Sequence, residues 1–355
     1  MKILHTADLH LGAPMRAILP PREQKLRREE LLSSFLRLSE AARREGCAAV
    51  IIAGDLFDTE AAAMMLSPSV LDAIGRFPQI DFYYVSGNHE REAELLGKAP
   101  ENLHIFGDRV TFFEKENVVF FGKRGAKYTD FENICLQERK INILVAHGAW
   151  AEGYNRGADL PLGFLRGKGI DYCALGHYHS YSERRIDYRG IAVYPGCPEG
   201  RGFDEIGPKG AVLIETAAHG VSHRFLPLCR RTLHRIEVCV SDAKSTLDLF
   251  MLCDGAVKDV TREDLVRLVL TGARVNIPMI DPLTVERHFL GRFYHVEIED
   301  RTVAAPVLDT LYRESSLRGE LVRRVSEDKA LTPEQKKSVI ALGLAALNGT
   351  LGGDV

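Results

Sequence analysis

The stretch Val50-Ile51-Ile52-Ala53-Gly54-Asp55-Leu56-Phe57-Asp58 decides how the rest of the chain can be interpreted. It follows Gly46 as an apolar run and ends in two carboxylates, which is typical of a buried strand that passes into a loop. Asp55 is therefore expected where the strand ends, at the carboxyl edge of a sheet. Because ligand sites in open α/β sheets gather at that edge, Asp55 is the first candidate for a functional residue.

Four other segments have the same construction, an apolar run that ends in Asp, His or Asn. Taken singly, most of them are explained better by a surface turn, a tight turn or a structural histidine, whereas the two histidines of Gly176-His177-Tyr178-His179 are more telling. Together with the first stretch they predict five strand ends that carry metal-type ligands in one chain. The candidate side chains of these four segments are Asp8, His10, Asn88, His89, His147, His177 and His179.

The candidate ligands are seven groups that offer nitrogen and oxygen atoms and no sulfur: Asp8, His10, Asp55, Asn88, His147, His177 and His179. This set is too large for one closed tetrahedral zinc site, and it suits two ions that share a bridging carboxylate. Two ions roughly 3.5–4 Å apart are the usual arrangement for in-line displacement at phosphorus. N and O ligands suit Mn, Fe or Zn, and the ligand set does not choose among these metals. We expect two divalent ions, with Mn²⁺ as the first expectation.

The whole chain has 355 residues, of which 45% are hydrophobic and 27% charged, as in ordinary globular proteins. The net charge is −3, so nucleic-acid binding would require a local basic patch or a metal. The seven cysteines are scattered without a C-x-x-C pair, which argues against a disulfide framework and a thiolate zinc site. No secretory h-region and no apolar run of about 18 residues is present, so we expect a cytoplasmic protein without a membrane span.

The first half of the chain alternates strands and helices, which indicates a sheet covered by helices. The expected strands are 2–7, 48–53 and 81–86, and the expected helices are 23–45 and 67–77. The second helix is placed with Ser67 as its N-cap, because Pro68 suits a first helical position. From residue 104 short strands dominate, including 141–146 and 171–175, which indicates a second sheet packed on the first.

The end of the chain has a different character. Residues 232–300 follow a β-α-β-α-β pattern without metal-type motifs, and residues 303–348 are expected to form two helices, the second beginning at Thr332-Pro333-Glu334-Gln335. The predicted architecture is therefore α/β, with a two-sheet domain at 1–230, a small separate α+β domain at 231–300 and a helical tail at 301–355.

The five motifs, in this order, resemble the calcineurin-like metallophosphoesterases, whose fold is a two-sheet sandwich flanked by helices. Ala7-Asp8-Leu9-His10-Leu11-Gly12, the Asp55 stretch and Tyr194-Pro195-Gly196 are most similar to DNA-repair nuclease subunits of the SbcD type. The stretch from Tyr194 to Arg201, followed by Gly207-Pro208-Lys209-Gly210, is closer still to the YhaO-like bacterial branch. The resemblance is specific over residues 1–228 and only architectural over 232–300, where it implies a capping domain.

The resemblance also implies a role for each candidate. His89 would face the scissile phosphate and either protonate the leaving oxygen or stabilise its charge, while Asp58 would orient His89. The ions would lower the pKa of a water, and the resulting hydroxide would attack phosphorus in line. Glu90 receives no chemical role. The implied metal ligands are Asp8, His10 and His179 for one ion and Asn88, His147 and His177 for the other, with Asp55 as the bridge.

Several basic side chains are candidates for a surface that follows DNA phosphates, each adding to salt-sensitive binding. A solvated charged face is the alternative. These residues are Arg16, Arg22, Lys123, Arg124, Arg184, Arg185 and Arg201.

The function implied by the resemblance is hydrolysis of DNA phosphodiester bonds, as by an exonuclease or endonuclease of double-strand-break repair. An SMC-like coiled-coil ATPase docking on the tail and a homodimer are the implied partners. A small substrate, such as a cyclic nucleotide, a nucleotide or a phosphoprotein, is the first alternative because the site would be the same. A scaffold without chemistry is the second, and it predicts missing ligands, whereas none is missing.

Overall fold

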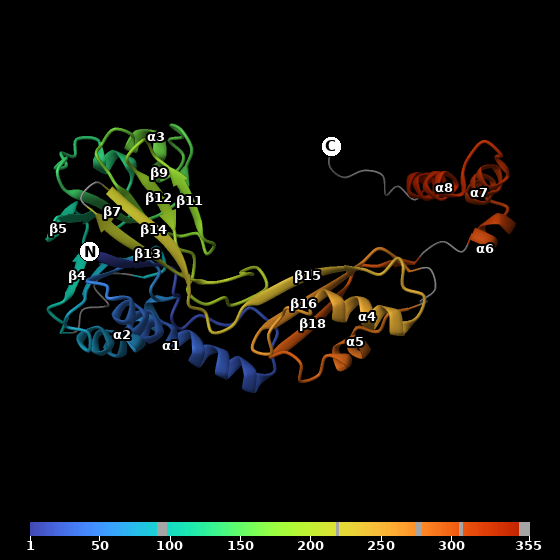
Figure 1. Ribbon diagram of the computed structural model, residues 1–355, viewed down its shortest axis with the longest axis horizontal. Coiled ribbons are helices and arrows are strands. Elements are labelled where there is room, and N and C mark those ends of the chain that lie inside the picture. The colour runs from blue at the N-terminus through green and yellow to red at the C-terminus, as the bar shows by residue number, and fades with distance from the viewer. Residues whose placement is uncertain (91–97, 218–219, 275–278, 305–307, 348–355) are drawn as a thin grey trace. The chain divides into compact units, whose positions relative to one another are not determined.

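The computed structural model describes residues 1–90, 98–217, 220–274, 279–304 and 308–347. The chain forms two compact units, whose helices and strands are labelled in Figure 1. Unit 1 comprises Met1–Arg235, Thr261–Arg267 and Gly291–His295, and unit 2 comprises Ile236–Val260, Leu268–Leu290 and Val296–Val355.

Unit 1 contains two six-stranded sheets, which confirms the expected two-sheet architecture. The β1–β4 strands run parallel in sheet 1, as do β6, β7, β10 and β12 in sheet 2, so within each sheet their carboxyl ends share one edge. Sheet 1 has the order β14 (Gly220–Pro227), β13 (Gly210–Ala217), β1 (Lys2–Thr6), β2 (Ala49–Ala53), β3 (Asp81–Val85) and β4 (Leu103–Phe106). Sheet 2 has the order β11 (Ser182–Arg185), β12 (Ile191–Tyr194), β10 (Tyr172–Gly176), β7 (Ile141–His147), β6 (Val118–Gly122) and β5 (Thr111–Lys115).

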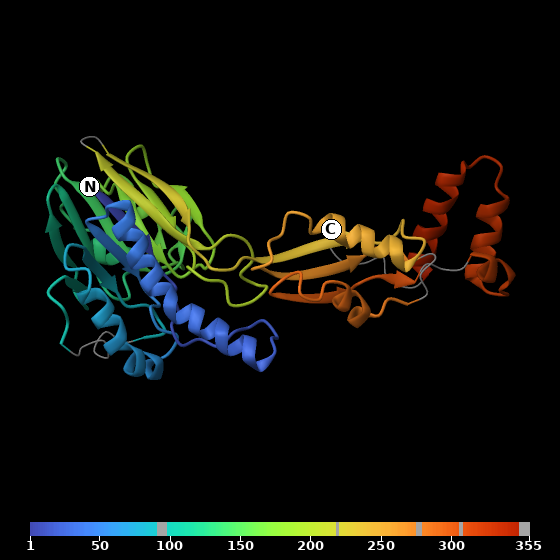
Figure 2. The ribbon, with the colours of Figure 1, turned by 60° about the horizontal axis from the view of Figure 1, so that its bottom comes forward.

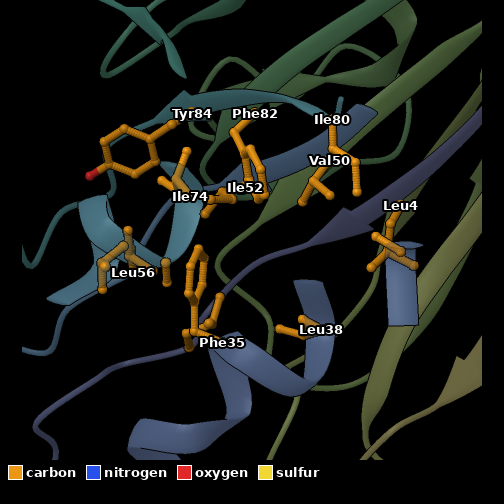
Figure 3. Close-up of a cluster of buried hydrophobic side chains, with 14 of the residues drawn as sticks. Leu4, Phe35, Leu38, Val50, Ile52, Leu56, Ile74, Ile80, Phe82 and Tyr84 are labelled. Atoms are coloured by element: carbon orange, nitrogen blue, oxygen red, sulfur yellow. The ribbon is translucent and has the colours of Figure 1, made fainter. Parts of the chain in front are cut away.

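Apolar side chains fill three layers of unit 1. Residues of both sheets, such as Ile51 and Ile143, form the middle layer. The other face of sheet 1 packs against α1 (Pro21–Glu45) and α2 (Glu60–Gly75), which lie side by side in Figure 2, and Figure 3 shows Phe35 of α1 against Ile52. Because both faces of β2 are covered, its sequence is an unbroken apolar run rather than an alternating one. The other face of sheet 2 is covered by a layer that includes a 3₁₀ helix at Tyr128–Phe131, β9 (Leu160–Pro161, paired with β8 at Trp150–Ala151) and α3 (Leu162–Leu165).

The second helix begins at Glu60, so the prediction that it starts after Ser67 is wrong. Thr59 is its N-cap, with the hydroxyl accepting a hydrogen bond from the N–H of Ala62 at 3.1 Å. The alanine- and methionine-rich segment that follows has high helix propensity, which carries the helix through Pro68 even though proline lacks an N–H. A Ser-Pro pair is a strong start signal only when no better cap precedes it.

After β14 the expected β-α-β-α-β order is observed. Three strands form one sheet with β16 in the centre, and a helix lies in each connection. The elements are β15 (Leu233–Cys239), α4 (Thr246–Ala256), β16 (Leu265–Thr271), α5 (Pro282–His288) and β18 (His295–Asp300), with β17 (Ala273–Arg274) paired to β19 (Val303–Ala304).

The tail contains three helices within the described residues, α6 (Leu308–Arg313), α7 (Leu317–Glu327) and α8 (Pro333–Leu347), where two were expected. The break lies at Ser316, which caps α7 by accepting from the N–H of Gly319. The predicted start of α8 is confirmed, because Thr332 and Gln335 exchange side-chain to main-chain hydrogen bonds of 3.3 and 2.8 Å. No helix in the described part of the chain has the length and apolarity needed to cross a membrane.

Replacing Glu199 by Ala is expected to lower the free energy of unfolding of unit 1 by about 3–5 kcal/mol, because it breaks a buried ion-pair network. The Glu199 side chain is fully buried and accepts from Arg27 at 2.9 Å and from Arg37 at 2.6 Å. Arg27 is itself only 1% exposed. Denaturant unfolding followed by circular dichroism measures the effect. In the control variant Glu40→Ala, which removes an exposed pair with Arg43, the change should stay below about 1 kcal/mol. A similar small change for Glu199→Ala would contradict a stabilising role for the buried network.

Candidate metal centre

The carboxyl ends of strands from both sheets bring the predicted ligands together. Asp8 and His10 follow β1, Asp55 follows β2, Asn88 and His89 follow β3, His147 ends β7, and His177 and His179 follow β10. Among the described residues, three groups of His and carboxylate side chains place their ligand atoms within 4.8 Å of one another. These groups are Asp8, His10 and His179; Asp8, Asp55 and His147; and His10, Asp58 and His89.

The imidazoles of His10 and His179 face each other across a possible cation position. The Nε2 atoms of His10 and His179 lie 3.2 Å apart. The other ring nitrogen of each is next to a carboxylate, because Nδ1 of His10 is 3.1 Å from Asp58 and Nδ1 of His179 is 2.7 Å from Glu205. A carboxylate accepts a hydrogen bond, so we assign the proton of each ring to Nδ1, and in this tautomer both Nε2 lone pairs point at the same space. A positive ion there removes their repulsion, so these residues fit a metal.

His147 indicates a second cation position. Its Nδ1–H donates to the carbonyl of Ala53 at 2.9 Å, while Nε2 is 3.4 Å from Asp55 and 3.0 Å from the amide oxygen of Asn88. Burial lowers the pKa of His147, but the hydrogen bond and charge of Asp55 outweigh it and raise the pKa to about 9. In the metal-free protein His147 therefore carries a proton on Nε2. This proton lies among oxygen acceptors, at a position that suits a metal ion.

Metal binding is expected to release about one proton per protein at pH 7. With a pKa of about 9, His147 is protonated below pH 9 and must lose its Nε2 proton before this nitrogen can bind a metal. The affinity for Mn²⁺ should therefore rise up to about tenfold per pH unit from pH 7 to 9 and level off above. Titration calorimetry in two buffers of different ionisation enthalpy measures the released proton. Uptake of a proton, or an affinity independent of pH, would contradict this protonation state.

Backbone strain marks the same residues. Among the described non-glycine residues with positive φ are Asp8 at 52°, His10 at 45°, Asp55 at 48° and His177 at 126°. Each such conformation costs on the order of 1–3 kcal/mol and clusters at functional sites. Main-chain hydrogen bonds between the two loops stabilise these conformations. The N–H groups of Asp8 and His10 donate to the carbonyls of Gly54 and Asp55 at 3.0 and 2.9 Å.

His177 is the predicted histidine ligand that lies outside the three groups. Its ring centroid is 5.6 Å from that of His147, and its side chain is exposed. Its main-chain N–H donates to both carboxylate oxygens of Asp8, at 3.0 and 3.1 Å, and so holds that side chain. The structure places His177 beside the site, and its imidazole as a ligand remains a prediction.

Asp58 lies beside His89, but its two parts have different partners. The main-chain oxygen of Asp58 accepts from Nδ1 of His89 at 2.9 Å, whereas its carboxylate is 3.1 Å from Nδ1 of His10. The expected orientation of His89 by Asp58 thus passes through the backbone, and the carboxylate orients His10 instead. His89 itself is exposed, and its N–H donates to Asp55 at 3.2 Å.

Sequence reasoning gave Glu90 no role, and the structure shows it as a clamp between two loops of the site. Its buried carboxylate accepts from the N–H groups of Leu56 and Phe57 and from the hydroxyl of Tyr84. Burial raises the pKa of Glu90 to about 7, against the opposing effect of the Tyr84 hydrogen bond. Glu90 therefore ties the loop that carries Asp55 to the loop that carries His89.

Glu205 is a second residue that sequence reasoning missed. It contacts His179 and lies only 3% exposed. One feature of the sequence could have indicated Glu205: it lies four residues after Arg201 in a glycine-rich loop. That signal is weak, because nothing local to the loop indicates that it folds over the His179 motif.

Most of the basic candidates for DNA contact are already paired. Arg201 is 3% exposed and bound to Glu205, so little of its side chain is available to a phosphate-tracking surface, and its place there stays a prediction. Arg22 and Arg185 are exposed, and they remain predictions. The ion pairs of the others are Arg16 with Asp204, Lys123 with Asp130, Arg124 with Asp108 and Arg184 with Glu152.

Several known proteins are similar to this chain. Residues 1–181 match the family described as calcineurin-like phosphoesterases. The uncharacterized metallophosphoesterase YhaO of Bacillus subtilis is 26% identical over 335 residues, which cover 86% of this chain and 80% of YhaO. The SbcD component of the nuclease SbcCD of Staphylococcus saprophyticus is 24% identical, over 67% of this chain and 71% of SbcD. The DNA double-strand break repair protein Mre11 of Methanosarcina acetivorans is 26% identical, and the match covers 64% of this chain and 39% of Mre11.

The family match begins before the Asp8 motif, ends after His179 and covers 181 of the chain's 355 residues. The chain therefore belongs to the calcineurin-like phosphoesterase family, whose members are metal-dependent hydrolases with a dimetal centre.

Proposed function

We propose that this protein is a two-metal phosphodiesterase that hydrolyses DNA, of the SbcD type and closest to the YhaO-like branch. The observation that carries the proposal is the pair of cation positions described above. One lies between the Nε2 atoms of His10 and His179, which are 3.2 Å apart, and the other lies at Nε2 of His147. Asp55 lies between them, with Oδ2 at 3.6 Å from His10 and 3.4 Å from His147.

The division of ligands that we propose is the one that the family resemblance implies. One ion is held by Asp8, His10 and His179, and the other by Asn88, His147 and His177, with Asp55 as the bridge. When bound, the two ions supply Lewis-acid stabilisation of phosphate charge and an activated water. The protein's own contribution is to hold the ligands on strained loops between two rigid sheets and to place His89 at the exposed side, where it donates a proton to the leaving oxygen or stabilises its charge.

DNA is favoured as the substrate by the relatives and by the chain's organisation. The SbcCD component and Mre11 carry nuclease and DNA repair in their names, and both are similar to this chain at low identity. Residues 231–300 and 301–355 follow the phosphoesterase domain as a proposed capping domain and a proposed partner-docking tail. We propose an SMC-like ATPase as the partner of the tail and a homodimer as the assembly.

The test is cleavage of linear double-stranded and circular single-stranded DNA with Mn²⁺, beside a bis-aryl phosphodiester and a cyclic dinucleotide. Degradation of DNA that Asp55→Asn abolishes supports the nuclease. If only the small esters are cleaved, the result supports the first alternative, a phosphoesterase with a small substrate and the same site. Binding of two ions without cleavage of any of these substrates would contradict activity by this chain alone and leave activity with an ATPase partner to be tested.

A further inference from the structure

The loop between β12 and β13 folds over the histidine that ends the last metal motif. Nδ1 of His179 is 2.7 Å from Oε1 of Glu205, and the carbonyl of His179 accepts from Nζ of Lys209 at 2.7 Å. Both Glu205 and Lys209 are 3% exposed. The loop therefore holds the imidazole and the main chain of His179 separately, with two buried charged side chains.

Arg201 links the contact between Glu205 and His179 to the contact between Asp58 and His10. Its Nη2–H donates to Oε1 of Glu205 at 2.7 Å, and its main-chain N–H donates to Oε2 at 2.8 Å. Its Nη1 lies 3.5 Å from the carboxylate of Asp58, which is the group that contacts Nδ1 of His10. One guanidinium thus lies between two carboxylates, and each carboxylate contacts the Nδ1 atom of one of the two facing histidines.

We propose that Glu205 and Arg201 are positioning residues for one ion of the pair: Glu205 fixes His179 with its proton on Nδ1, and Arg201 links Glu205 to Asp58, which does the same for His10. This inference rests on the proposed metal centre and deepens it. Neither residue touches the substrate or the ion.

The same contacts also offer a partner for the other tautomer of His179. Nη2 of Arg201 also lies 3.1 Å from Nδ1 of His179, and it would donate there if that nitrogen had no proton. The Nε2–H tautomer would then point a proton at the metal position. The Glu205 carboxylate excludes this tautomer, because an unprotonated Nδ1 would place its lone pair 2.7 Å from a carboxylate oxygen. Carboxylate partners of this kind typically account for about 10- to 100-fold in metal affinity.

The test compares Glu205→Gln with a matched control, Asp171→Asn. Asp171 is also buried, accepts from Arg189 at 2.7 and 2.8 Å and lies at the amino-terminal end of β10, the opposite end from the metal motifs. Mn²⁺ binding is followed by calorimetry and electron paramagnetic resonance. The histidine tautomers are followed by long-range ¹H–¹⁵N correlation of metal-free and Zn²⁺-loaded protein, and thermal unfolding monitors the fold.

We expect wild type to bind two ions and Glu205→Gln to bind one of them about 10- to 100-fold more weakly, with the other changed less than about threefold. In the metal-free variant, His179 should populate the Nε2–H tautomer. Asp171→Asn should keep both affinities and the wild-type tautomer even if it unfolds at lower temperature. Wild-type affinities in Glu205→Gln, or losses no larger than in the control, would overturn the positioning role while the metal centre stands. Failure of the wild type to bind two ions would overturn the centre itself.

Discussion

Replacing Asp55 by Asn is expected to prevent binding of the metal pair and to lower kcat/KM for phosphodiester hydrolysis by roughly 10³-fold or more, because the activated nucleophile requires the ions. Asp55 is 2% exposed, and its Oδ2 lies within 3.6 Å of Nε2 of both His10 and His147. Burial raises the pKa of Asp55, but the hydrogen bond and charge of His147 and the charge of His10 lower it to about 2. The side chain is therefore an anion at any working pH, and the amide removes the charge that both cation positions share.

The matched control is Asp81→Asn, because Asp81 begins β3 at the opposite end of sheet 1 and pairs with Lys115. This variant should bind both ions and hydrolyse a bis-aryl phosphodiester within about twofold of wild type, as expected for a surface pair. Metal content by mass spectrometry and initial rates in Mn²⁺ measure both effects. If the Asp55→Asn variant still binds two ions tightly, this result would contradict the proposed bridging role of Asp55.

Replacing His89 by Asn is expected to lower kcat by about 10²- to 10⁴-fold, the usual contribution of a positioned general acid, while metal affinity stays within about threefold. The reason is the role proposed for His89, which faces the substrate from the exposed side of the centre and is not one of the proposed ligands. Its ring lies edge-on to that of His10, with centroids 4.9 Å apart, and its Nδ1–H donates to the main-chain oxygen of Asp58. Nε2 is left for the substrate.

The choice of substrate separates the two roles proposed for His89. An aryl leaving group needs little protonation, so a general acid predicts a much smaller defect with a bis-aryl ester than with DNA. Equal losses on both substrates would instead favour stabilisation of charge on the phosphate. Loss of bound metal in His89→Asn would contradict both roles and make His89 a ligand.

The ends of the strands were predictable because they depend on local sequence. The run before Asp55 is apolar throughout and the runs before Asp8 and His147 are largely apolar, since these strands are buried on both faces. Glycine beside the polar residue permits the tight approach that a shared edge requires. At Gly54, for example, φ is 89° and an added Cβ would lie 2.2 Å from Nδ1 of His147. Parallel strands that meet at one edge bring such residues together by topology alone.

Features that depend on competition between nearby signals were predicted less well. The α2 helix begins at the Thr59 cap because that signal and the following alanines outweigh Ser67-Pro68. In the tail, Ser316 divides one expected amphipathic helix into α6 and α7. In both cases every competing signal was present in the sequence, but their relative strengths depend on the packing of the finished helix.

The two-sheet architecture, the strand ends and the candidate ligands could be predicted from the sequence, because apolar runs and their terminal residues are local properties. Which side chain contacts which became visible only in the folded chain. The tertiary structure buries Arg201 between Glu205 and Asp58, although Asp58 lies 143 residues away in the chain. It also turns the Asp58 carboxylate toward His10 rather than His89. Such contacts depend on how loops from two sheets fold over a common edge, and no short-range pattern records the distance between residues so far apart in sequence.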